Sequence, residues 1–285
     1  MKSRRFLTIA ALVAVIWSLL PIYWFCRMAF LTPTEIQRFP WPLIPHAPNL
    51  ASFFNIFGFN YRLASGIVSP ASGQAGQIIN GLEDSLIVST AVMVLTLAIV
   101  LPLSYVFARI EFAFKNVLLF AILLAVALPP VSTLIPFYTM YIRVGLAGTL
   151  TGLVIVDLTI TVPFVAWMLI GYFRNLPPIE RLARVDGYGR LAAFGQLVLP
   201  LARSGVAVAA VIAFLFAWNE YTYALVLVNG TTANTLPTAI SGFLYQYPEP
   251  GNLAAAVLVT IVPPAMVAYF LQRHIGEMNL VDPLR

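Results

Sequence analysis

The sequence predicts an all-α membrane protein with six transmembrane helices and both termini in the cytoplasm. Of its 285 residues, 60% are hydrophobic and 9% are charged, and the mean hydropathy is +0.89. A soluble domain of this length could not bury that much apolar surface. Six windows reach the roughly 20 apolar residues that a helix needs to cross a bilayer. We therefore expect a single transmembrane domain over residues 1–285.

The six predicted spans follow one another along the chain with two long connections between them. The first span comes directly after three basic residues, as a secretory signal would, but its apolar stretch is too long for one. No A-x-A-like cleavage site follows it, so we expect an uncleaved anchor. The predicted spans cover residues 6–29, 82–108, 117–142, 150–172, 205–228 and 253–271.

The positions of the basic residues determine the predicted orientation. With a cytoplasmic N-terminus, the outer segments and span ends hold four of the 16 basic residues, Arg27, Arg38, Arg62 and Arg143. Cytoplasmic loops of membrane proteins carry an excess of Lys and Arg, so this orientation is the favoured one. The net charge of +5 follows from the topology, and we expect no nucleic-acid binding. The basic residues on the cytoplasmic side are Lys2, Arg4, Arg5, Arg109, Lys115, Arg174, Arg181, Arg184, Arg190, Arg203, Arg273 and Arg285.

The segment 31–81, predicted to form a periplasmic or extracellular loop, is much longer than a membrane crossing requires. It contains six prolines and a Gly/Ser/Ala-rich stretch at 65–76, which favour irregular structure. It also contains seven aromatic residues, whose burial can offset the entropy cost of ordering. We expect an irregular folded cap that rests on the membrane or on a partner. A floppy insertion without a role is the alternative.

The cytoplasmic segment 173–204 is predicted to contain a short helical hairpin. The Pro-Pro pair at 177–178 suits the first turn of a helix, where the missing N–H is not needed, and Glu180 then lies near the positive end of the helix dipole. Gly187 ends this helix, because glycine readily adopts the left-handed conformation. The second short helix is predicted to pass through Leu191, Phe194 and Leu197 and to end before Pro200.

The first helix of this hairpin has an apolar stripe beside two arginines. Ile179, Leu182 and Ala183 recur at i, i+3 and i+4, which places them on one helix face. An amphipathic helix of this kind can lie at the lipid surface or dock to a soluble partner. The residues alone favour these two interpretations equally.

The hairpin sequence resembles the signature loop of binding-protein-dependent ABC importer permeases. In that family a Glu-Ala-Ala run leads to Asp-Gly, then to a Phe eight residues after the Asp and a Pro-Leu pair that begins fourteen after it. Here Phe194 and Pro200 stand at those distances from Asp186. Along most of its length, the chain resembles the carbohydrate branch of the family, which is typified by the smaller permease of maltose importers. The matching motifs include Pro21-Ile-Tyr-Trp24, Tyr105-Val-Phe-Ala-Arg109, Pro129-Pro130, Gly145-Leu146, Phe173-Arg-Asn-Leu-Pro177, Phe216-Ala-Trp218-Asn219-Glu220 and Gln272-Arg273.

This resemblance implies one permease subunit of an ATP-driven importer with the type I importer fold, in the bacterial plasma membrane. Its partners would be a second permease, two ATPase subunits that bind ATP and Mg, an extracytoplasmic substrate-binding protein and membrane lipid. The cargo would be a sugar, an oligo- or disaccharide first of all, with polyols and glycerol phosphates as alternatives. The residues implied in coupling to the ATPases are Glu180, Arg181, Leu182, Ala183, Asp186, Gly187 and Phe194.

Three features depart from the family pattern. Arg181 stands where the signature has Glu, with Glu180 one place earlier, and Leu182 replaces the first Ala. A contact between the family Glu and a basic ATPase residue must therefore be remade by Glu180 or reversed in sign. In the second span, Asp84-Ser85 replaces the usual Asn-Ser, and residues 278–285 lack the usual Gly-rich basic ending.

No sequence pattern for enzymatic chemistry is present. The two lysines, Lys2 and Lys115, do not follow glycine, so the chain has no Walker A loop to hold ATP, and it has no Gly-x-Ser-x-Gly turn. His46 and His274 are predicted on opposite sides of the membrane and cannot share a metal, and Cys26 is the single cysteine. We expect no catalytic residue, cofactor or metal on this chain.

Two carboxylates fall within the predicted spans, where a charge is costly unless it faces a polar path. Asp157 and Glu220 lie in the outer halves of their spans, and Trp218, Asn219 and Tyr223 near Glu220 can stack on a sugar or bond to its hydroxyls. These five residues are a candidate lining of the translocation path. Alternatively, they join helices through hydrogen bonds. A proton-coupled transporter with Asp157 or Glu220 as relay is a further hypothesis, which leaves the hairpin unexplained.

Overall fold

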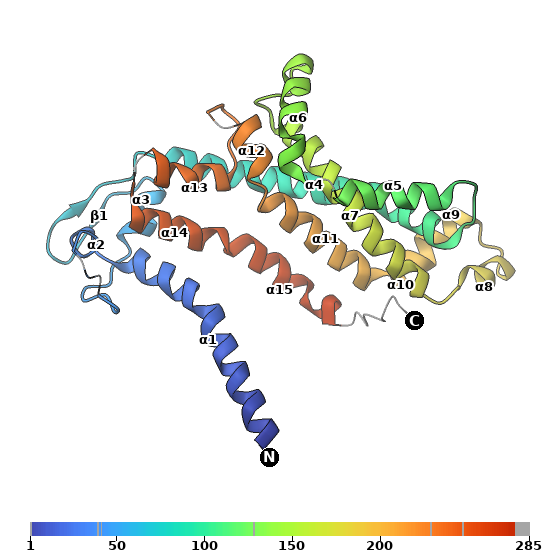
Figure 1. The fold of residues 1–285 in the computed structure, drawn as a ribbon, viewed down its shortest axis with the longest axis horizontal. Coiled ribbons are helices and arrows are strands. Elements are labelled where there is room, and N and C mark those ends of the chain that lie inside the picture. Colours follow the sequence, from blue (N-terminus) through green and yellow to red (C-terminus); the bar gives the residue numbers. More distant parts are fainter. Residues whose placement is uncertain are drawn as a thin grey trace. The chain divides into compact units, whose positions relative to one another are not determined.

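The computed structural model describes residues 2–38, 40, 42–127, 129–228, 230–246 and 248–276, without the side chains of 2–5, 181 and 273–276. These residues are mostly helical and form two compact units. Among the described residues, the first unit spans 2–82 and 236–262, and the second spans 83–235 and 263–276. Figure 1 shows the elements coloured in chain order, from blue to red.

The first unit joins the N-terminal helix to a cap, segment 31–74, and to two helices from late in the chain. Helix α14 is at its centre, because it packs against α1, α3 and α13. Helix α4 begins at Ala75, so the last residues of the predicted outer loop are helical. The elements of this unit are α1 (Lys2–Phe30), α2 (Pro33–Ile36), α3 (Ala51–Ile56), β1 (Tyr61–Arg62), antiparallel β2 (Val68–Ser69), α13 (Leu236–Tyr245) and α14 (Pro250–Thr260).

Carboxylates organise the hydrogen bonds of the cap. Thr32 and Glu35 form a capping box at the start of α2, and Glu35 also accepts from the backbone N–H of His46 at 2.9 Å. Burial tends to raise the pKa of Glu35, but these hydrogen bonds outweigh it and hold the pKa below its ordinary value of 4.5. Glu249, which precedes α14, accepts from the Ser72 hydroxyl at 2.7 Å and so ties the cap to that helix.

The second unit is built around α7, which packs against α5 and α11 (Figure 1). Thr96 and Thr161 join α4 to α7 by a buried hydroxyl pair at 2.9 Å. Gly205 lets α11 approach α7 closely, since a Cβ there would lie 2.4 Å from the Tyr172 ring. The helices of this unit outside the hairpin are α4 (Ala75–Arg109), α5 (Lys115–Ala127), α6 (Pro130–Val144), α7 (Leu150–Asn175), α11 (Arg203–Trp218), α12 (Thr222–Leu227) and α15 (Val262–Gly276).

The apolar helices agree with the predicted all-α membrane fold. Among the described residues, five helical segments are long and apolar enough to cross a membrane, or six if the bent pair α5 and α6 forms one span. The predicted span over 117–142 is divided into two helices, because α5 and α6 meet at 94°. Pro129 and Pro130 explain the break: each lacks a backbone N–H, and each disfavours helical geometry in the residue before it.

The fifth and sixth predicted spans are interrupted as well. Helix α11 ends at Trp218 and α12 begins at Thr222, so the motif residues Asn219 and Glu220 lie between two helices. The sixth span changes from α14 to α15 at Ile261, just before a Pro-Pro pair.

Candidate functional site

The cytoplasmic hairpin predicted from the sequence begins with a two-turn helix, α8 (Glu180–Val185). Glu180 lies in its first turn, as predicted, whereas Pro177 and Pro178 precede the helix instead of opening it. Ile179 is the N-cap residue, and its backbone N–H bonds to the carbonyl of Pro177 at 2.8 Å. The two prolines therefore form the turn that leads from α7 into the hairpin.

Gly187 ends α8 in the way its position predicts. Its φ of +85° lies in the left-handed region, which glycine adopts without a steric penalty. The backbone N–H of Gly187 bonds to the carbonyl of Arg184 at 3.2 Å, and the N–H of Tyr188 bonds to that of Ala183 at 2.9 Å. These two bonds are a Schellman motif, which satisfies the last carbonyls of the helix and turns the chain sharply.

An ion pair anchors the start of α8 to the end of α4. Arg109 Nε lies 3.1 Å from Glu180 Oε1, and both atoms are shielded from solvent. The same guanidinium donates through its second terminal nitrogen to the carbonyls of Leu176 at 2.6 Å and Pro177 at 3.2 Å. Arg109 thus holds the end of α7, the turn and α8 together. Glu180, predicted as a coupling residue, directs its carboxylate to this internal contact.

Aromatic packing anchors the second half of the hairpin. The Phe194 ring lies 4.7 Å from the Tyr105 ring of α4, and Tyr105 also meets Phe173 of α7 edge to face at 6.2 Å. Phe194 packs against a buried cluster that includes Phe173 and Val198. The Phe of the signature is therefore a packing residue in this chain.

The prediction of where the second helix ends is wrong. Residues 190–201 continue as α9 (Arg190–Ala193), a π-helical turn (Phe194–Val198) and α10 (Leu199–Leu201). In the widened turn, the N–H of Leu199 bonds to the Phe194 carbonyl five residues back. Pro200 then falls in the first turn of α10, where its missing N–H is not needed, so it does not stop the helix.

The predicted apolar stripe of α8 is divided between two faces. Ala183 is buried and Ile179 packs against the buried cluster, whereas Leu182 is 70% exposed. Leu182 shares the exposed face with Val185, which is 85% exposed. The helix thus presents an apolar surface away from the rest of the chain. Asp186 and Gly187 are exposed at its end, and the side chain of Arg181 lies outside the described residues.

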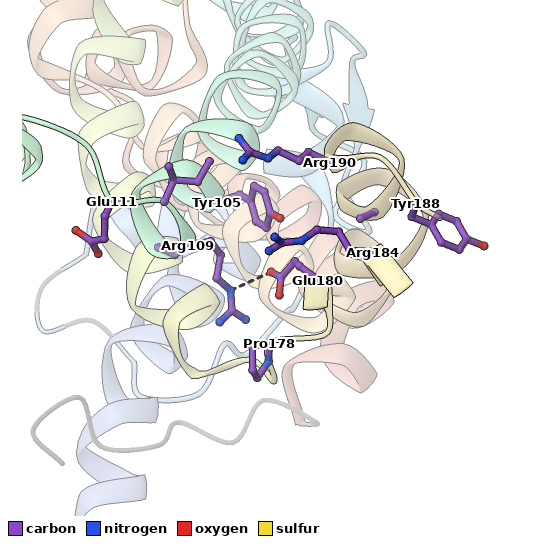
Figure 2. A pocket seen from close by; sticks show the side chains of 11 residues that line it. Tyr105, Arg109, Glu111, Pro178, Glu180, Arg184, Tyr188 and Arg190 are labelled. Carbon is purple, nitrogen blue, oxygen red and sulfur yellow. Dashed lines mark ion pairs between the residues drawn. The ribbon is translucent and has the colours of Figure 1, made fainter. Parts of the chain in front are cut away.

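A hollow of about 460 Å³ lies between the hairpin and the end of α4 with the connection that follows it. We call it the arginine hollow, because Arg109, Arg184 and Arg190 line it together with Tyr105 and Glu111. Figure 2 shows Tyr105 between Arg190 and Arg184, while Arg109 is paired with Glu180. The sequence placed these arginines on one side of the membrane but did not indicate that they meet.

The second group of predicted residues lies around Asp157 in α7. Asp157 is 3% exposed, its Oδ1 has no hydrogen-bond partner, and it lies within electrostatic range of Tyr141, Tyr223 and Glu220. The Tyr141 hydroxyl is also buried without a hydrogen-bond partner. The Tyr223 hydroxyl bonds to the hydroxyl of Thr133 in α6 at 2.6 Å. Tyr141 and Thr133 had no motif that could have identified them, since they join the group only through packing.

The break between α11 and α12 is held by side chains of the motif at 216–220. Glu220 accepts from the backbone N–H groups of Tyr223 at 2.7 Å and Ala224 at 2.9 Å, which caps α12. Trp218 is 2% exposed and stacks on Phe214. Asn219 is exposed and donates to the Leu215 carbonyl at 2.8 Å. The structure thus brings Asp157, Glu220 and Tyr223 together, while Asn219 faces outward.

The described residues contain no group of three or more His, Cys, Asp or Glu side chains that could hold a metal ion. His46 is 80% exposed and lies beside Glu35, and Cys26 is a free thiol. The side chain of His274 and the terminal residues 278–285, whose departure from the family was noted, lie outside the described part.

Comparison with known proteins identifies the family. Residues 100–277 match the model of the binding-protein-dependent transport system inner membrane component. The chain is 31% identical to the trehalose transport system permease protein SugB of Mycobacterium tuberculosis (strain CDC 1551 / Oshkosh), over 91% of this chain and 89% of SugB. It is 27% identical to the maltodextrin transport system permease protein MdxG of Bacillus subtilis (strain 168), over 69% of this chain and 72% of MdxG.

The fold is likewise that of a solved transporter. A chain of a bacterial ABC transporter involved in the import of the acidic polysaccharide alginate superposes with a TM-score of 0.77 at 16% identity, over 96% of this chain and 98% of that one. The signature hairpin between α7 and α11, the apolar helices and the match over residues 100–277 lead to one conclusion. The chain belongs to the family of binding-protein-dependent transport system inner membrane components.

Proposed function

We propose that this chain is the permease subunit of an ATP-driven sugar importer and that its hairpin 173–204 docks to the ATPase on the cytoplasmic side. The proposal rests on one observation above all. The hairpin is fastened to the membrane helices through Arg109, Glu180 and Phe194, while its outer face is left apolar and exposed. A segment that is fixed to the membrane helices on one face and exposed on the other can pass a movement of a bound protein on to those helices.

The fastening supports a mechanical form of coupling. Arg109 joins the end of α4 to the end of α7, and Phe194 packs on rings from both helices. A displacement of α8 therefore reaches both helices at once. In this proposal two ATPase subunits hold ATP and Mg, and their closure moves the hairpin and switches the packing of the helices between two arrangements. The permease itself carries out no chemical step.

The remaining partners follow from the same proposal. A second permease completes the translocation path, and a substrate-binding protein delivers the cargo on the side opposite the hairpin. Both termini are then cytoplasmic, which places the cap 31–74 on the side of the binding protein. The distribution of basic residues supports this orientation.

For the cargo we propose a neutral sugar, with an oligo- or disaccharide ahead of a polyol or a glycerol phosphate. The names of SugB and MdxG, which refer to trehalose and maltodextrin, support this choice. Asn219 is the predicted path residue that the chain leaves exposed. Asp157, Trp218 and Tyr223 are buried, and Glu220 caps α12, so we assign these four to supporting the helix break beside the path.

The test is reconstitution of the chain with its co-purifying permease and ATPase in sealed vesicles. Uptake of the sugar is expected to require both ATP and the binding protein. A protonophore added at constant ATP serves as the control, and uptake should continue in its presence. Uptake without ATP, or uptake that stops with the proton gradient, would refute the proposal and favour the proton-coupled alternative.

A further inference from the structure

The arginine hollow has a charge balance that the coupling role of the hairpin does not explain. Its lining contains three arginines and two carboxylates. Glu180 is paired with Arg109, and Glu111 is paired with Lys115 at 2.7 Å. Among the described residues, neither Arg184 nor Arg190 has an ion-pair partner. Two permanent positive charges therefore face a cavity large enough for a small anion.

Arg184 lies on the other side of α8 from the proposed docking face, and Arg190 joins it in the hollow from the start of α9. Glu180 and Arg184 are four residues apart and line the hollow, which places them on one face of the helix. Leu182 and Val185 are exposed and do not line the hollow, so they belong to the opposite face. A partner that covers the apolar face leaves the hollow open on the side of the membrane helices.

One side of the hollow is formed by the end of α4 and the connection that follows it. Tyr105 and Arg109 come from the last turns of α4, and Glu111 comes from the short connection to α5. Figure 2 shows the Tyr105 hydroxyl directed toward Arg184. Tyrosine is enriched at the level of lipid headgroups, and basic pockets at the cytoplasmic ends of membrane helices suit anionic headgroups. Arginine matches the geometry of a phosphate with two parallel N–H groups.

We propose that the arginine hollow binds the headgroup phosphate of an anionic lipid from the cytoplasmic leaflet, held by Arg184 and Arg190. This inference rests on the proposed function in one respect, since the orientation of the importer puts the hollow at that leaflet. The bound lipid occupies the space between the hairpin and α4, so the position of the hairpin relative to the membrane depends on the lipid.

The experiment measures binding of dioctanoyl phosphatidylglycerol to the assembled, detergent-solubilised complex by native mass spectrometry. The variant Arg184→Gln/Arg190→Gln is expected to bind this lipid at the hollow about 30-fold more weakly, because each arginine near a phosphate contributes about 1 kcal/mol and 1.4 kcal/mol is tenfold. The control Arg143→Gln/Arg174→Gln removes the same charge from exposed positions outside the hollow and should bind as the wild type does. Arg184→Lys/Arg190→Lys keeps the charge and should retain most of the binding.

The other outcomes each overturn the proposal. Equal lipid binding by the wild type and the double Gln variant would show that Arg184 and Arg190 do not hold the lipid. Inorganic phosphate that displaces the lipid at equal concentration makes it a free-anion site. Loss of the ATPase from the double Gln complex with unchanged lipid binding shows that the arginines contact an acidic partner. Lipid binding is measured without transport, so a failure of ATP-dependent uptake refutes the proposed function separately.

Discussion

Replacing Arg109 by methionine tests whether the hairpin is coupled to the membrane helices through this side chain. The substitution keeps most of the stem and removes the guanidinium. It leaves Glu180 Oε1 without its partner 3.1 Å away and frees the carbonyls of Leu176 and Pro177. The side chains of Arg109 and Glu180 are 16% and 15% exposed. The contribution of this ion pair to stability therefore lies between the roughly 0–1 kcal/mol of a surface pair and the roughly 3–5 kcal/mol lost when a buried pair is broken. We expect about 2 kcal/mol less stability in the anchoring of α8.

Hydrogen exchange of the backbone amides in 180–188 measures this loss directly. A decrease of about 2 kcal/mol in the free energy of local opening corresponds to exchange about 30-fold faster in the Arg109→Met complex. ATP-dependent uptake should fall more than ATP hydrolysis does, because the docking face itself is unchanged. Arg174→Met, at an exposed position on the same side, is the matched control and should change neither measurement.

A double-mutant cycle determines whether the ion pair causes the effect. Glu180→Gln removes the buried negative charge, so the double variant Arg109→Met/Glu180→Gln should be less destabilised than the sum of the single variants, by about 1 kcal/mol or more. Additive effects, or amide exchange in 180–188 that Arg109→Met leaves unchanged, would refute the reasoning.

Three further predictions concern other parts of the chain. Gly187→Ala forces a side chain into a left-handed φ of +85° and should destabilise the hairpin by about 1–2 kcal/mol, seen as faster amide exchange; Gly189→Ala, at a φ of −69°, should not. Gly205→Leu places a side chain where even a Cβ lies 2.4 Å from the Tyr172 ring, so we expect the thermal unfolding temperature in detergent to drop by several degrees; an unchanged temperature would contradict the close helix approach. Because Glu35 has a lowered pKa in the folded cap, its contribution to stability is present above the ordinary value of 4.5 and is lost as the pH falls through the lowered pKa. Glu35→Gln should remove that part of the pH dependence of unfolding, and an identical pH profile would contradict it.

The sequence predicted the elements that depend on local chemistry. The apolar windows predicted the long helices, and Gly187 predicted the end of α8. The spacing of Phe194 from Asp186 identified the hairpin as the signature loop. The 94° bend between α5 and α6 could not be deduced from the Pro-Pro pair at 129–130, since proline breaks helices by very different angles.

What the sequence did not predict depends on contacts between distant residues. Arg109 was visible as one more cytoplasmic charge, and nothing in its neighbourhood indicates a partner in α8. Arg184 and Arg190 likewise gave no sign that they share a cavity with Tyr105. The continuation of the helix past Pro200 was missed because proline usually ends a helix, whereas here Pro200 stands in the first turn of α10, after the π-helical turn at Phe194–Val198.

The bonds from Arg109 to the carbonyls of Leu176 and Pro177 have a consequence for protein engineering. Residues 173–204 cannot be transferred as a self-contained segment, since Arg109, which holds the hairpin in place, belongs to α4. A chimera that receives only this segment keeps the proposed docking face but loses its attachment to the recipient's helices. Grafting it into another permease should therefore succeed where the recipient has an arginine at the position of Arg109 and an aromatic ring at that of Tyr105.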